Sequence, residues 1–279
     1  MSSVRIRVPA TTANVGPGFD CLGIAFQVYN IVTVTEGDSI PDAMADEAGA
    51  AFFRRSEVTP FPFRWQIAGE VPRSRGMGSS VTVRLGILHG LNELSNQALT
   101  PDDLYALCSE LEGHPDNAAP AAYGGFTIAR MGAPLQRYHV GDGLHFVLLI
   151  PDFEIATPDA RRVLPESITL KDAVISSSNA AAVAGAFASG DYDKLSGCFE
   201  DRIHQPYREK LIPCLTAVLK AGQAAGALGG WLSGSGSTIA CLTKSNAEAV
   251  AEAMVAASGL ANTKTVITKA DNTGVLVLP

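Results

Sequence analysis

The stretch Pro72–Gly86, "PRSRGMGSSVTVRLG", constrains this chain more than any other, because two glycines and two serines run directly into an apolar segment. Val81, Leu85 and Leu88 fall on one face at helical spacing, which predicts a buried helix that begins near Ser79. The free N–H groups and the positive dipole end of such a helix attract anions. A Walker loop would carry a lysine here, and this stretch has none. The sequence therefore predicts a phosphate-binding loop of another type.

The glycines and the paired serines of this loop admit two interpretations. Gly76 and Gly78 permit positive φ values and close backbone approaches. Ser79 or Ser80 could cap the helix, which is the ordinary role of a serine at that position. A cap needs only one serine and no preceding glycines, so the loop favours an anion site over a simple cap.

The composition limits the class of protein. The chain has 279 residues, of which 47% are hydrophobic, and a net charge of −7. This is enough for a large core, and the negative charge argues against a nucleic-acid or anionic-membrane surface. Five widely spaced cysteines indicate free thiols in a reducing compartment. The start of the chain lacks a signal-peptide pattern, so we expect a cytoplasmic protein. From the negative charge we expect no nucleic-acid partner, and we also expect no membrane partner.

Strand and helix patterns interleave without the strict alternation of a doubly wound parallel sheet, which favours a mixed α+β protein with layered helices and sheets. Strands are predicted at 4–8, 29–35, 63–68, 125–130, 144–150, 237–243, 263–268 and 273–278. Helices are predicted at 79–95, 101–112, 171–188, 207–225 and 246–258. The proline- and charge-rich segment 150–165 predicts a boundary between two domains, 1–150 and 151–279.

A polar loop follows the first predicted strand. Pro9–Gly23 reads "PATTANVGPGFDCLG", and Asn14 and Asp20 are its groups that could face a ligand. By itself this loop is typical of a Gly/Pro turn held by side-chain bonds to its own backbone. A Gly/Ser loop at Gly229–Leu242 is by itself equally weak evidence for a binding site, since a tight hairpin has the same composition.

A second polar loop follows the helix predicted at 101–112. Leu111–Gly125 reads "LEGHPDNAAPAAYGG" and contains Glu112, His114, Asp116 and Asn117. One histidine without a nearby cysteine does not make a zinc site. A carboxylate with hydroxyl and phosphate oxygens is the usual Mg²⁺ arrangement, so Glu112 and Ser80 could supply such a set jointly.

Two further stretches, 157–165 and 201–213, contain arginines. Most arginines are solvated surface groups. A guanidinium can also bind a carboxylate through two parallel hydrogen bonds, so an amino-acid-like substrate would require one or more of them.

Together and in this order, these blocks resemble the GHMP kinases, a family named after galacto-, homoserine, mevalonate and phosphomevalonate kinases. The family's phosphate loop has the form Pro-x-x-x-Gly-Leu-Gly-Ser-Ser-Ala, and Pro72–Val81 reads "PRSRGMGSSV". The first loop, "LEGHPDNAAPAAYGG", "ARRVLP" and "HQPYREKLIP" look most like the members that act on homoserine. The similarity spans about Val4 to Leu242. It implies a two-part α+β fold with a ribosomal-protein-like N-terminal half and a ferredoxin-like C-terminal half.

The resemblance also implies an activity. ATP, with Mg²⁺, would phosphorylate the side-chain hydroxyl of L-homoserine to O-phospho-L-homoserine on the way to threonine. Two alternatives stay open: a GHMP kinase for another small alcohol, and a non-catalytic metabolite-sensing protein on the same fold. "EGHPDN" and the arginines argue against the first, because sugar and isoprenoid alcohols lack an ammonium–carboxylate pair. Ser80, Glu112 and Asp20 argue against the second. A homodimer is compatible with an exposed sheet edge.

By matching motif positions, the resemblance implies a role for each candidate residue. The nucleotide would contact Pro72, Arg73, Ser74, Arg75, Gly76, Met77, Gly78, Ser79, Ser80, Val81, Thr82, Gly234, Ser235 and Gly236. Mg²⁺ would be held by Ser80, not Ser79, and by Glu112. The homoserine site would contain Asn14, Asp20, His114, Arg161 and Arg208. The catalytic candidates are Asp20, Asp116 and Asn117, but we expect no strong general base, since phosphoryl transfer needs mainly positioning and charge neutralisation.

The chain departs from the family pattern at two places. Where the family carries another strand and an Asn-Leu segment near the adenine, this chain has only "SIPDAMADEAGAAFFRR". We therefore expect its base contacts to differ. "VTVR" replaces the small residues usual after the serines, and Arg84 is expected to point outward.

Overall fold

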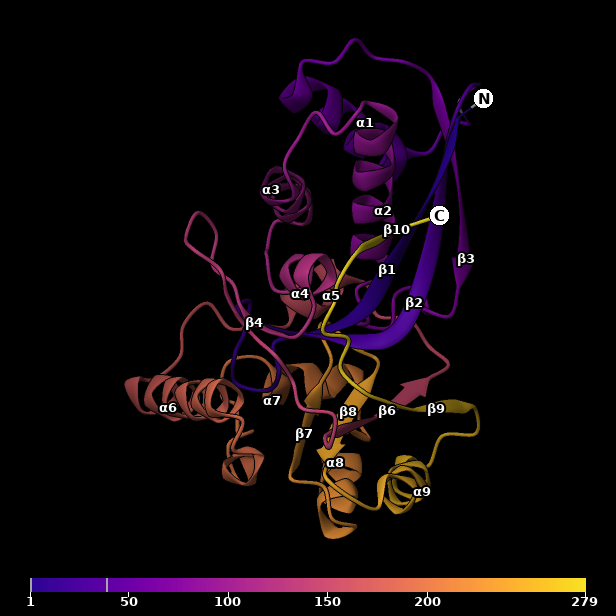
Figure 1. Ribbon diagram of the computed structural model, residues 1–279. Helices are drawn as coiled ribbons and strands as arrows, with labels where there is room; N and C mark the ends of the chain where they lie inside the picture. Colours follow the sequence, from indigo (N-terminus) through magenta and orange to yellow (C-terminus); the bar gives the residue numbers. More distant parts are fainter. Residues whose placement is uncertain (1, 39) are drawn as a thin grey trace.

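Two antiparallel sheets organise the chain, one in each half of the molecule (Figure 1). The structure is a computed structural model that describes residues 2–38 and 40–279. In the N-terminal half the strand order is β10-β1-β2-β4-β5, and β3 also pairs with β2. These strands are β1 (Ser3–Ala13), β2 (Leu22–Glu36), β3 (Phe63–Gly69), β4 (Phe126–Ile128), β5 (Gln136–Tyr138) and β10 (Leu276–Leu278).

Four helices belong to the N-terminal half, and α2 is central because its N-terminus carries the phosphate loop. They are α1 (Ala43–Ser56), α2 (Ser79–Leu94), α3 (Pro101–Glu112) and α4 (Ala118–Tyr123). The helix predicted at 79–95 is confirmed. It packs unusually close to β2: a Cβ at Gly86 would lie 2.5 Å from the Cβ of Val32, and one at Gly90 would lie 2.4 Å from Val34 Cγ2. This close packing fixes the height of the loop above the sheet.

The ends of α3 position Glu112. Thr100 and Asp103 form a reciprocal capping box, and Pro101 occupies the first turn, as the sequence predicts. Gly113 then adopts φ 79° and ends the helix. Glu112 is therefore the last residue of α3, and its side chain points toward α2.

The C-terminal half has the ferredoxin-like fold that the resemblance implies. Its sheet has the order β7-β8-β6-β9, and α8 and α9 separate the strands in a β-α-β-β-α-β sequence. The strands are β6 (His145–Pro151), β7 (Gly229–Leu232), β8 (Ile239–Thr243) and β9 (Thr263–Thr268). The helices are α5 (Thr157–Arg162), α6 (Leu170–Ser189), α7 (Gln205–Arg208), α8 (Leu215–Ala224) and α9 (Ala247–Ser258), with 3₁₀ turns at Tyr192–Leu195 and Glu209–Leu211.

The sheets do not follow a single cut at residue 150. β6 pairs with β8 and β9 and so belongs to the second sheet, whereas β10 returns to pair with β1 in the first. The chain thus crosses between the halves twice, and α4, α5 and α7 lie at the junction (Figure 1). No helix in the described ranges is long and apolar enough to cross a bilayer.

Several predicted elements need correction. β1 continues to Ala13 through an irregularity at Pro9/Ala10, so the polar loop is shorter than Pro9–Gly23. The helix predicted at 207–225 is broken into α7, a 3₁₀ turn and α8. Pro213 explains the break, because it lacks the N–H that a continuous helix would use. The sequence did not predict the 14-residue helix α1 or the short elements α4, α5, β5 and β7.

Candidate active site

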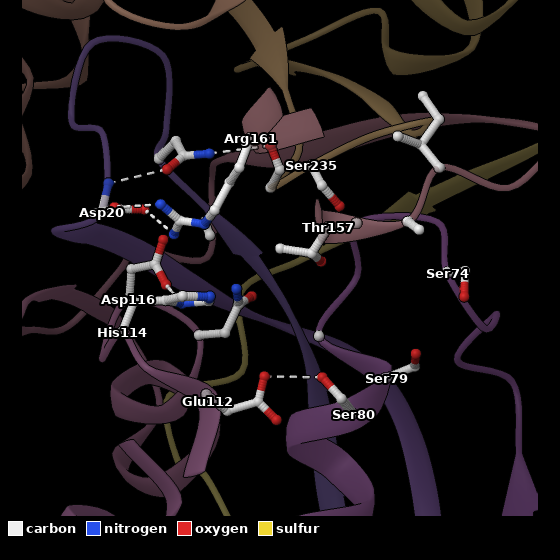
Figure 2. A pocket seen from close by; sticks show the side chains of 18 of the residues that line it. Asp20, Ser74, Ser79, Ser80, Glu112, His114, Asp116, Thr157, Arg161 and Ser235 are labelled. Atoms are coloured by element: carbon white, nitrogen blue, oxygen red, sulfur yellow. Dashed lines mark hydrogen bonds and ion pairs between the residues drawn. The ribbon is translucent and has the colours of Figure 1, made fainter. Parts of the chain in front are cut away.

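A cavity of about 180 Å³ is lined by residues from both halves of the chain (Figure 2). Of the predicted site residues, it brings together Asn14, Asp20, Ser74, Gly76, Gly78, Ser79, Ser80, Glu112, His114, Asp116, Asn117, Arg161, Arg208, Gly234 and Ser235. These come from six separate segments of the chain. The blocks recognised separately in the sequence thus meet at one place.

Other residues assigned to the nucleotide do not line this cavity: Pro72, Arg73, Arg75, Met77, Val81, Thr82 and Gly236. Met77 is buried in the hydrophobic core. The hydroxyl of Thr82 donates to Ser79 O and accepts from Asn30 Nδ2. The side chains of Met77 and Thr82 therefore support the loop from behind.

Arg75 links the phosphate loop to the C-terminal half. Its Nε donates to Pro151 O at 3.0 Å, and its terminal nitrogens lie 3.6 Å from Asp152 and 3.3 Å from Glu154. Its side chain is thus directed to the segment after β6 and holds the loop against that segment.

The phosphate loop presents unpaired backbone donors. Gly78 is the N-cap of α2 with φ 66°, and no side chain caps the helix, so neither serine serves as the cap. Within the described chain, no acceptor pairs with the backbone N–H groups from Gly76 to Ser80. Together with the helix dipole, these donors could hold an anion such as a phosphate group.

Gly76 is required by its surroundings, and we expect Gly76→Ala to be strongly destabilising. An added Cβ would lie 2.0 Å from Ser233 O, at φ +70°. Gly113→Ala is the matched control, because Gly113 has φ +79° but nothing within 4 Å of its Cβ position. Urea unfolding should show a loss of roughly 1–2 kcal/mol for the control. Gly76→Ala should lose about 3 kcal/mol or more. Equal losses would mean that the close approach has no energetic consequence.

Glu112 and Ser80 lie side by side in the wall of the cavity and are joined by a hydrogen bond (Figure 2). Ser80 Oγ donates to Glu112 Oε2 at 2.9 Å, and the Glu112 side chain is only 9% exposed. Among the described residues, no group of three or more metal-ligating side chains occurs. One carboxylate and one hydroxyl beside a phosphate site fit Mg²⁺, which takes few protein ligands and completes its shell with phosphate oxygens and water.

Arg84 does not point outward as expected. It lies one helical turn after Ser80, and its Nη1 donates to Glu112 Oε1 at 2.6 Å. Its Nη2 donates to Glu47 Oε2 on α1 at 2.7 Å. Burial alone would lower the pKa of Arg84, but its bonds to Glu112 and Glu47 raise that pKa above its ordinary value. The guanidinium thus stays positively charged, and it contacts Glu112, the carboxylate that is a candidate metal ligand.

The first loop is held in a left-handed conformation at Asn14 (φ 68°) and Asp20 (φ 56°). Asn14 Oδ1 accepts from Asp20 N, and Asn14 Nδ2 donates to Gly234 O. The carboxylate of Asp20 forms two hydrogen bonds with Arg161, at 2.9 and 3.1 Å (Figure 2). Asn14 therefore orients the loop so that Asp20 faces the cavity and α5.

Arg208 is a buried guanidinium, 2% exposed, in the same cavity. It donates to Ala160 O, to Gly234 O and to His204 Nδ1, all neutral acceptors. Burial lowers the pKa of Arg208 to about 10, and repulsion by Arg161 adds to the shift. Arg208 is still charged at neutral pH, so it is suited to an anionic ligand group.

Phe19 and His204 are site residues that the sequence reasoning missed. The guanidinium carbons of Arg161 and Arg208 lie 5.6 and 5.4 Å from the centre of the Phe19 ring, and His204 stacks on that ring at 5.2 Å. Burial lowers the pKa of His204, so its neutral ring accepts from Arg208 and donates to Gly16 O. The block "HQPYR" contained His204, but only the fold shows that it supports Arg208.

The two catalytic candidates after α3 have structural partners. Asp116 is 2% exposed and its Oδ1 lies 2.8 Å from His114 Nδ1, a bond that raises the pKa of His114. Asn117 Oδ1 accepts from Thr11 Oγ1 at 2.7 Å. Both side chains line the cavity, with these bonds fixing their orientation.

A second cavity, of about 370 Å³, shares Ser74, Ser79 and Ser80 with the first. Its other walls include apolar side chains from β3, the segment after it, α1 and α2: Met44, Trp65, Ile67, Val71 and Val83. The segment that departs from the family pattern thus contributes Met44 and the helix α1 beside the phosphate loop. This cavity has room for a planar apolar group.

Family models agree with this arrangement. The model described as "GHMP kinases N terminal domain" matches residues 43–125, and "GHMP kinases C terminal" matches residues 183–259. A phosphate loop at a helix N-terminus, joined to a ferredoxin-like half across a shared cavity, defines a small-molecule kinase, and the chain belongs to the GHMP kinase family. Membership implies ATP as co-substrate.

Within this family, the proteins similar to this chain include several homoserine kinases. The homoserine kinase of Caldicellulosiruptor bescii is 36% identical over 98% of this chain and 96% of its own length. That of Moorella thermoacetica is 38% identical over 90% and 91%. A crystal structure of homoserine kinase from Cytophaga hutchinsonii superimposes with a TM-score of 0.89, at 28% identity and over 100% of this chain and 98% of that one.

Proposed function

We propose that this protein transfers the γ-phosphoryl group of ATP to the side-chain hydroxyl of L-homoserine and so forms O-phospho-L-homoserine for threonine synthesis. The observation that carries the proposal is the buried cation of Arg208 in one cavity with Asp20 and the phosphate loop. An amino acid has an ammonium group for Asp20 and a carboxylate for Arg208. The names of the relatives point to the same substrate.

The ion pair between Asp20 and Arg161 also supports a zwitterionic substrate. Both side chains are partly exposed, at 35% and 39%, and each already holds an opposite charge at hydrogen-bond distance. A bound amino acid would replace that pair with two: its ammonium on Asp20 and its carboxylate on Arg161 and Arg208. Each charge keeps a partner, so desolvation of the pair is compensated.

The nucleotide would bind across both cavities. Its phosphates would accept hydrogen bonds from the backbone N–H groups of 76–80, and its base would enter the apolar cavity beside Trp65. Ser80 and Glu112 would hold Mg²⁺, which when bound supplies the positive charge that a Walker lysine supplies elsewhere. The chain's own residues then orient the acceptor hydroxyl and exclude water.

No strong general base is needed in this arrangement, and we expect Asp116→Asn to reduce kcat by less than about 10²-fold. The amide retains the size of the carboxylate and can still accept from His114. Steady-state kinetics at saturating ATP and homoserine measure the loss. A loss of roughly 10²–10⁴-fold would instead identify Asp116 as the base.

A coupled assay of ADP release tests the function itself. The purified protein is assayed with ATP and Mg²⁺, with and without L-homoserine, and with a panel of other small alcohols. Turnover that depends on homoserine supports the proposal. Turnover only with another alcohol would make it a different GHMP kinase, and binding without turnover would make it a sensor.

Two finer proposals concern the protein's surroundings. All five cysteines are free thiols, which supports a cytoplasmic location. The homodimer stays a prediction; β5 and β10 end the order of the first sheet and offer edges for pairing.

A further inference from the structure

Arg84 places a largely buried guanidinium beside Glu112, close to the phosphate loop. It follows Ser80 by one turn of α2 and joins two carboxylates, Glu112 on α3 and Glu47 on α1. The Arg84 side chain is 15% exposed and that of Glu112 is 9% exposed, whereas Glu47 is 52% exposed. The strongest effect of the guanidinium is therefore on Glu112, because charges act most strongly where solvent is excluded.

The two oxygens of Glu112 have different partners. Oε1 accepts from Arg84 at 2.6 Å, and Oε2 accepts from Ser80 at 2.9 Å. Only Oε2 is thus oriented to the hydroxyl that would share the metal. The guanidinium both fixes the rotation of the carboxylate and cancels its charge.

This charge balance discriminates between two forms of the metal. A free divalent cation that approached Glu112 would be repelled by Arg84 in direct contact with its ligand. A Mg²⁺–nucleotide complex carries a net negative charge and is attracted by the N–H groups of 76–80 and the dipole of α2.

We propose that Arg84 is a positioning residue that orients and neutralises the metal carboxylate, so that Mg²⁺ binds there as the nucleotide complex and only weakly by itself. This inference rests on the proposed assignment of Glu112 and Ser80 to the metal. It concerns the form in which the metal binds, and it holds whichever alcohol accepts the phosphoryl group.

Binding of Mn²⁺ without nucleotide, followed by electron paramagnetic resonance, tests the proposal. The native protein should bind Mn²⁺ weakly, and Arg84→Met should bind it about tenfold or more tightly, since the cation beside Glu112 is gone. Arg84→Gln is a second neutral variant in case the methionine protein folds poorly. Arg84→Lys retains a positive charge and should bind Mn²⁺ within about twofold of the native protein.

A double variant locates the effect. Arg84→Met combined with Glu112→Gln should lose the gain, because the freed carboxylate is its source. Unchanged Mn²⁺ affinity in both neutral variants, or a gain that survives Glu112→Gln, would overturn the proposal. Homoserine-dependent turnover is measured separately, so a failure of the proposed function and a failure of this inference are told apart.

Discussion

Replacement of Arg208 by glutamine is expected to lower kcat/KM for L-homoserine by roughly 10²–10³-fold, mainly through KM. Arg208 is 2% exposed and its donors otherwise meet only neutral acceptors, so its charge is free to pair with the carboxylate. Among the described residues that line the cavity, the other arginine is Arg161, which is 39% exposed. The KM for ATP should change less, because Arg208 does not line the second cavity and reaches the predicted nucleotide residues only through its bond to Gly234 O. Steady-state kinetics with each substrate varied in turn measure both effects.

Two other arginines serve as controls for Arg208. Arg202 lies in the same block but is exposed and bonded to Glu200, and Arg202→Gln should leave both KM values unchanged. Arg161 is 39% exposed and already forms an ion pair with Asp20, so Arg161→Gln should lower kcat/KM for homoserine less than Arg208→Gln does. If Arg161→Gln caused the larger loss, the carboxylate would lie at α5 and the assignment of Arg208 would be wrong.

The local features of the chain could be predicted from its sequence because their causes are local. Thr100, Pro101 and Gly113 define α3 through caps and dihedral preferences that act within a few residues. The apolar face of α2 and the paired glycines before it likewise depend on neighbours in sequence. The order of the motif blocks then predicted which loops would meet, and the structure brings them to one cavity.

The features that the sequence did not reveal depend on distant partners. Arg84 was expected to point outward, and its position in the sequence does not reveal its partners, because Glu47 and Glu112 come from two other helices. β6 and β10 lie in the sheets of the opposite halves because strand pairing is set by the whole fold. Phe19 was missed for the same reason, since an apolar residue in a polar loop gives no sign of the arginines that flank it.

Glu112→Gln is expected to reduce kcat/KM for ATP in the presence of Mg²⁺ by roughly 10²-fold or more, and to raise the Mg²⁺ concentration needed for half-maximal turnover. The amide has the size of the carboxylate and can still bond to Ser80, so the loss would come from charge. It would also leave Arg84 paired only with the exposed Glu47, so the cation beside the metal position would be less well compensated.

Glu110, two residues earlier on the exposed side of α3, gives the matched control for Glu112. Glu110 is 54% exposed and pairs with Arg55, away from the cavity, so Glu110→Gln removes the same charge from the same helix. It should leave the Mg²⁺ dependence of turnover unchanged. A Glu112→Gln enzyme with the Mg²⁺ dependence of the native protein would show that Glu112 is not a metal ligand. The bond between Ser80 and Glu112 would then be a structural link between α2 and α3.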